Sequence, residues 1–198
     1  MRRPRRDSLV VALAVGVVLG VATRYVYELP AEWRWLHRVG VPWLAVAFAV
    51  GALARRPGRG AVGGVVCLVA GVLVYYAAID LAHGPREVTP FALGWSAIAV
   101  PGGAAFGALG ALYAGGRARV LASSVLTAAF VGEAVLFALL VPAAGRPGTI
   151  LLAVALALPF LLLRRARERA LALASSAVLA GAAVVAEGSV FALTKYVG

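Results

Sequence analysis

Four ionisable side chains stand inside long apolar runs of this sequence: Arg24, Asp80, Glu133 and Glu187. A charge at the centre of a bilayer costs about 2.5–3.5 kcal/mol on insertion scales, so such residues usually face a helix-bundle interior or a polar cavity. With Tyr76, one helical turn before Asp80, they are candidate groups for binding a solute or a proton. Chemistry at these positions depends on helices that hold the side chains away from lipid.

Arg24 follows Gly16 and Gly20 at four-residue spacing and precedes Glu28 by one turn, so all four residues share one helix face. The guanidinium can pair with Glu28 as an i,i+4 ion pair. Alternatively, its fork of N–H donors can hold a carboxylate or another anionic solute. The spacing leaves both interpretations open.

Asp80 shares a helix face with Tyr76 and His83. An acid, a phenol and an imidazole suit proton or cation handling. The alternative is an interfacial cluster that closes the end of the helix.

Glu133 lies about fourteen residues into its apolar run, which predicts a position near the bilayer midplane. Its partner must therefore come from another helix. Glu187 follows a stripe of small residues formed by Ser176, Ala180 and Ala183, which allows close helix contact. For both glutamates the alternative to ligand binding is a structural hydrogen bond.

The composition predicts an integral membrane protein. Of 198 residues, 63% are hydrophobic and 14% are charged, more apolar surface than a soluble domain of this length can bury. The net charge of +11 comes from basic clusters between apolar runs, as in the loops of membrane proteins. We therefore expect the lipid bilayer, and not nucleic acid, as the partner of this charge.

Apolar runs near 20 residues predict an all-α, polytopic transmembrane bundle with seven spans in one integral membrane domain, 1–198. The runs cover about 8–27, 40–55, 61–82, 91–114, 120–141, 148–163 and 170–194. The second and sixth are short, so six spans with one re-entrant or tilted segment remain an alternative.

Orientation follows from the distribution of Lys and Arg. Thirteen of the 19 lie on one predicted side, in clusters within 2–6, 55–59, 117–119 and 164–169. The positive-inside rule then places the N-terminus in the cytoplasm.

Two segments read as an internal parallel repeat, residues 117–139 and 167–193. Each runs from a basic cluster through Leu-Ala-Ser-Ser and small apolar residues to a glutamate, then to Phe-Ala-Leu. The matched glutamates are Glu133 and Glu187, and a phenylalanine follows each by four residues.

Several glycine patterns have competing interpretations. Gly58, Gly60 and Gly63 match the dinucleotide fingerprint GxGxxG, but no soluble strand precedes them, so we discard that motif. Pro101-Gly102-Gly103 predicts a break in the fourth span of the kind that lines transporter sites. Equally, Gly103 and Gly107 form a small-xxx-small packing face, which we favour.

No hydrolase, kinase or metalloprotease motif and no metal-ligand spacing is present, and the sequence has one cysteine. We therefore expect a protein that is not an enzyme and that uses no cofactor or metal.

The run from Val41 to Gly110 resembles a family of uncharacterised multi-pass membrane proteins from high-GC actinobacteria. The resemblance rests on Pro42-Trp43 with Gly51, on Tyr75-Tyr76, and on Trp95 with Pro101-Gly102 to Gly110; Glu133 and Glu187 fit the same pattern. It implies the architecture and no activity. A weaker likeness is to the substrate-capturing membrane subunits of vitamin transporters.

Two functions follow from these observations. The first is small-solute or proton-coupled transport, by this chain alone, as an oligomer or as the membrane subunit of a transporter. The second is a non-transporting interaction or assembly protein, in which the charged residues pair internally.

Overall fold

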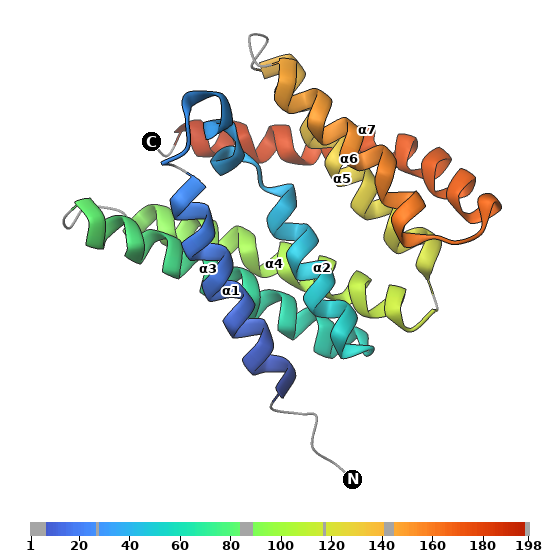
Figure 1. Cartoon of the computed structure of the whole chain (residues 1–198), viewed down its shortest axis with the longest axis horizontal. Helices are drawn as coiled ribbons and strands as arrows, with labels where there is room; N and C mark the ends of the chain where they lie inside the picture. Colours follow the sequence, from blue (N-terminus) through green and yellow to red (C-terminus); the bar gives the residue numbers. More distant parts are fainter. Residues whose placement is uncertain (1–6, 27, 84–88, 117, 141–144, 197–198) are drawn as a thin grey trace. The chain divides into compact units, whose positions relative to one another are not determined.

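The computed structural model describes the chain except residues 1–6, 27, 84–88, 117, 141–144 and 197–198. Some side chains within the helices, including those of His83 and Glu187, also lie outside the described part. The described residues form an all-α structure of seven α-helices and one 3-10 helix, and no strand (Figure 1). The elements are α1 (Asp7–Val26), η1 (Ala31–Arg38), α2 (Val41–Ala54), α3 (Pro57–His83), α4 (Thr89–Ala114), α5 (Arg119–Leu140), α6 (Gly145–Leu162) and α7 (Ala166–Tyr196).

The all-α prediction is confirmed, and each of the seven predicted apolar runs corresponds to one α-helix. Within the described residues, four helices are long and apolar enough to cross a bilayer: α1, α3, α4 and α5. A fifth span results if η1 and α2, which meet at a bend of 54°, are counted as one broken span. The apolar part of α6 is shorter, Arg146–Leu162. The membrane character therefore has structural support, whereas the count of seven spans and the orientation stay predictions.

The chain divides into two compact units, Met1–Arg117 with helices α1 to α4 and Ala118–Gly198 with helices α5 to α7. The expectation of one integral domain over 1–198 stays a prediction.

In the first unit, α4 packs between α2 and α3 through glycines. A Cβ atom on Gly107 would collide with the backbone of Gly60 on α3, and a Cβ on Gly51 of α2 would collide with the backbone of Gly107. One turn away, a Cβ on Gly103 would lie only 2.7 Å from the carbonyl oxygen of Gly64. Such contacts occur only where helix backbones touch, as small residues permit in membranes.

This packing decides between the two interpretations of the glycine patterns. Gly103 and Gly107 are a helix-contact face, as favoured, and α4 continues as a helix through Pro101. Gly60, from the discarded fingerprint, faces the backbone of α4. After α4 the chain turns at Gly116, whose φ of +74° lies in the left-handed region that favours glycine.

The helices α1 and α3 run parallel and also touch through glycines. A Cβ on Gly16 would lie 3.1 Å from Ala70 Cβ, and a Cβ on Gly20 would lie 3.0 Å from the Tyr75 nitrogen. From Gly16 to Gly20 along α1, the contacted residue changes from Ala70 to Tyr75 along α3, so the two helices are parallel. Cys67 is fully buried, and its backbone lies against Gly16.

In the second unit, α5 packs against both α6 and α7. Near the start of α6, a Cβ on Gly148 would lie 3.1 Å from the carbonyl oxygen of Ala134 and 3.9 Å from Ala138 Cβ, both on the last turns of α5. The helix α6 is therefore antiparallel to α5. At the far end of α6, Arg169 of α7 stabilises the turn between the two helices. The Arg169 Nε donates to the Leu163 carbonyl at 2.8 Å, and the guanidinium lies 5.3 Å from the Phe160 ring centre.

Candidate functional site

Arg24 pairs with a carboxylate of its own helix. Its Nη1 lies 2.7 Å from Glu28 Oε1, and the two side chains are 11% and 61% exposed. This contact is the i,i+4 pair that the spacing allowed. The Nε of Arg24 is buried and has no hydrogen-bond partner among the described residues. One donor of the guanidinium therefore remains for an anionic ligand.

Tyr76 and Asp80 lie on the last turns of α3. Tyr76 packs against the buried cluster Ala47, Leu68, Val72 and Ala99, and its ring meets that of Tyr75 edge-on at 5.1 Å between centres. Asp80 is half-buried and is not without an interaction partner. The His83 side chain, expected beside it, lies outside the described part.

The register of α1 and α3 places Arg24 and Asp80 toward the same end of the first unit. Gly20 lies against the Tyr75 nitrogen. From that contact Arg24 is four residues further along α1, and Asp80 is five residues further along α3. At 1.5 Å per residue these are rises of about 6 and 8 Å. The two side chains therefore share a depth in the helix pair.

Glu133 is a buried carboxyl residue, 8% exposed, on a helix with the properties of a membrane span. Along α5 it lies about 5 Å beyond the helix midpoint at 1.5 Å per residue, as the sequence indicated. It is not without a partner. Among the predicted site residues whose side chains the structure describes, Glu133 is the most buried.

The sequence analysis missed two hydroxyl groups on the same helix. Ser123 and Thr127 are 0% and 1% exposed, and neither hydroxyl has a hydrogen-bond partner among the described residues. A buried polar group without a partner costs about 1–3 kcal/mol, so each needs an explanation. The signal that could have found them is their i,i+4 spacing within the predicted span 120–141.

The helices of the proposed repeat, α5 and α7, meet at their serine pairs. Ser124 Oγ lies 2.7 Å from Ser175 Oγ, so the second serine of one copy contacts the first serine of the other. Each oxygen also lies within hydrogen-bond distance of a carbonyl one turn back, Ser124 of Val120 and Ser175 of Leu171. Because a hydroxyl has one hydrogen, one serine donates across the contact and the other donates to its own helix. The contact is compatible with the repeat, which itself stays a prediction. The side chain of Glu187, further along α7, lies outside the described part.

A double-mutant cycle can measure the coupling of these serines. We expect Ser124→Ala and Ser175→Ala to interact by about 0.6 kcal/mol, up to about 1.7, the range found for hydrogen bonds between membrane helices. The measurement is reversible unfolding in detergent of the wild type, both single variants and the double variant. Ser176, whose hydroxyl bonds to the Leu173 carbonyl of its own helix at 2.8 Å, provides the control: Ser124→Ala and Ser176→Ala should be additive.

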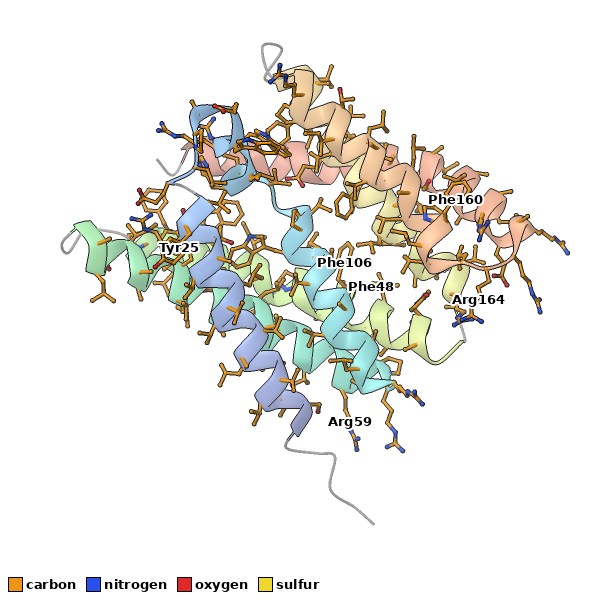
Figure 2. All side chains as sticks on the ribbon, viewed as in Figure 1. Tyr25, Phe48, Arg59, Phe106, Phe160 and Arg164 are labelled. Carbon is orange, nitrogen blue, oxygen red and sulfur yellow. The ribbon has the colours of Figure 1, made fainter. Side chains whose placement is uncertain are left out.

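The predicted site residues divide between the two units. Arg24, Tyr76 and Asp80 belong to the first, and Glu133 and Glu187 belong to the second. Their convergence on one polar centre therefore stays a prediction. The exposed side chains of Arg59, in the first turn of α3, and of Arg164, between α6 and α7, extend away from the helices, as Figure 2 shows. Among the described residues, no group of three or more His, Cys, Asp or Glu could hold a metal ion.

Comparisons with known proteins agree with the resemblance and add no activity. A family model described as a family of unknown function matches residues 2–192. No curated protein and no solved structure matches the chain. Membership of an uncharacterised family is thus confirmed, and the actinobacterial origin stays a prediction.

Proposed function

Because the chain belongs to that family of unknown function (DUF6518), we propose a role from its own side chains: small-solute or proton-coupled transport across the bacterial plasma membrane. In this proposal all seven α-helices cross or enter the bilayer, with the N-terminus in the cytoplasm. The chain acts alone, as an oligomer or as the membrane subunit of a transporter.

The buried carboxyl group of Glu133 carries the proposal. It lies on α5, one of the four described helices with the length and hydropathy of a span, and is 8% exposed. An ionisable group held away from both lipid and water marks solute or proton pathways in membrane proteins. The buried hydroxyls of Ser123 and Thr127, on the preceding turns of α5, extend this polar character along the helix.

Arg24 supports a second element of the same role. Its ion pair with Glu28 leaves Nε without a partner among the described residues. A carboxylate or another anion that approached this end of the first unit would meet a preformed, partly desolvated guanidinium. In the transport proposal Arg24 receives the solute together with Asp80, at similar depth on α3, and with Tyr76, one turn before Asp80.

The closed Arg24–Glu28 pair also favours the alternative, a non-transporting interaction or assembly protein. In that function the charged residues stabilise the helices and no ligand reaches them. The two functions differ in whether Glu133 is needed for an activity or only for folding.

Reconstituted proteoliposomes test the proposal. With an imposed pH gradient and a trapped pH-sensitive dye, we expect the wild type to dissipate the gradient faster than protein-free vesicles. Glu133→Gln, which keeps the shape and removes the titratable group, should slow this flux by roughly tenfold or more if the carboxyl group relays protons. Glu32→Gln, on the exposed surface of η1, is the matched control and should transport as the wild type does.

A screen of small metabolites by thermal shift covers solutes other than protons, since a ligand of the folded state raises the unfolding temperature. A hit that stabilises the wild type and Glu32→Gln, but neither Glu133→Gln nor Arg24→Gln, supports transport. If the wild type shows neither proton flux nor a hit, and Glu133→Gln only lowers the unfolding temperature, the interaction function replaces it.

A further inference from the structure

A proline interrupts the hydrogen bonding of α6 inside the second unit. Pro159 lies within the helix, so the carbonyl of Ala155 has no N–H to accept from at that position. Ala155 is 0% exposed and Pro159 is less than 2% exposed. Water at the protein surface therefore does not satisfy this carbonyl, and buried backbone carbonyls are nearly always satisfied.

The same face of α6 that carries Pro159 contacts α5. Gly148, Ala155 and Pro159 follow one another at spacings of seven and four residues, which keeps them on one helix face. Gly148 packs on Ala134 and Ala138 of α5. The carbonyl that Pro159 leaves without a helix N–H therefore lies on the side of α6 that contacts α5.

The antiparallel register identifies what lies opposite the break. Pro159 is eleven residues after Gly148, or about 16 Å at 1.5 Å per residue, which is close to three full turns. Eleven residues back from Ala134 and Ala138 are Ser123 and Thr127. Pro159 thus faces the two hydroxyls as Gly148 faces the two alanines.

These two hydroxyls do not use the bond that is usual for Ser and Thr in a helix. The hydroxyl oxygens of Thr23, Ser124 and Ser175 each lie 2.7–2.8 Å from the carbonyl oxygen four residues back, within hydrogen-bond distance. The hydroxyls of Ser123 and Thr127 have no partner within hydrogen-bond distance in the described part of the chain. By this register, two buried hydroxyls and a carbonyl left without its helix N–H lie at one level of the α5–α6 contact.

We propose that Ser123, Thr127 and the Ala155 carbonyl form a binding site for a buried water molecule between α5 and α6. Water suits this set because it donates to the carbonyl and exchanges hydrogen bonds with both hydroxyls, the three bonds that buried waters typically make. All three ligands are neutral, which disfavours a dehydrated cation. The site is independent of the transport role of Glu133.

The first test compares two threonine variants. If the Thr127 hydroxyl were dry, Thr127→Val would remove an unsatisfied polar group at constant shape and raise the unfolding temperature. The water site predicts the opposite, a lower unfolding temperature for Thr127→Val. Thr23→Val is the matched control, because that hydroxyl already bonds to the Leu19 carbonyl at 2.8 Å. An unfolding temperature of Thr127→Val at or above that of the wild type overturns the proposal.

A second variant ties the effect to the proline. Pro159→Ala restores the missing N–H, which satisfies the Ala155 carbonyl within the helix. The effect of Thr127→Val should then shrink in the Pro159→Ala background, whereas equal effects in both backgrounds overturn the proposal. If NaCl raised the unfolding temperature of the wild type more than choline chloride did, and Thr127→Val abolished that difference, the site would bind a cation. That result would also overturn the proposal.

Water-edited solid-state NMR observes the ligand directly in the wild-type protein, and a variant serves only for assignment. The chain has five threonines, so signals of 13C-threonine can be assigned by difference with Thr127→Val. We expect magnetisation from water to reach Thr127 faster than Thr23, which has no released carbonyl beside it. Equal or slower transfer to Thr127 overturns the proposal.

Discussion

Gly107→Ala is expected to destabilise the first unit by about 3 kcal/mol or more, at the upper end of the cost of overpacking. A Cβ on Gly107 would lie 2.9 Å from the carbonyl carbon of Gly60 and 3.1 Å from Gly64 Cα, both backbone atoms of α3. Backbone cannot rotate away as a side chain can, so α3 and α4 would have to separate. Unfolding in SDS, followed by circular dichroism, measures the effect.

The same helix provides the control. A Cβ on Gly94 of α4 would meet nothing within 4 Å. Gly94→Ala should therefore keep the packing and gain up to about 1 kcal/mol of helix propensity. If Gly107→Ala were as stable as Gly94→Ala, the close approach of α3 and α4 would be wrong.

The contact between α1 and α3 can be tested through the one cysteine of the sequence. Cys67 is fully buried, and a Cβ on Gly16 would lie 3.1 Å from both its carbonyl carbon and Ala70 Cβ. Leucine at position 16 does not fit this contact. We expect Gly16→Leu to displace α1 and to raise the rate at which a membrane-permeable maleimide labels Cys67 by roughly tenfold or more, because local opening controls access to buried groups.

The control for this experiment is Gly58→Leu, on the same helix as Cys67, where a Cβ would meet nothing within 4 Å. Its labelling should stay as slow as that of the wild type. Labelling of Gly16→Leu at the wild-type rate would show that Gly16 does not cover Cys67.

The candidate site could be predicted only in part. The positions of Arg24 and Glu133 on their helices follow from local sequence, because an ionisable residue within an apolar run is visible without coordinates. The structure contains the pair of Arg24 with Glu28, one of the two possibilities, and anion binding by Arg24 stays a prediction. The sequence could not distinguish Ser123 and Thr127 from the other hydroxyl residues of the predicted helices. Hydroxyls in helices usually bond to their own backbone, as Ser124 does, and only the burial and bonding of each hydroxyl separate the two cases.

The sequence alone determined the class of protein and the positions of its helices. Long apolar runs must be helical in a bilayer, since the hydrocarbon region offers no partner to backbone groups outside an internal helix ladder. The choice of neighbouring helices belongs to the tertiary structure. With 23 glycines, many small-xxx-small pairs are available, and nothing local indicates that Gly107 meets Gly60 or that Gly148 meets Ala134. Those contacts depend on which backbones approach closely over their whole length, because attraction between helices in lipid is the sum of many short-range contacts.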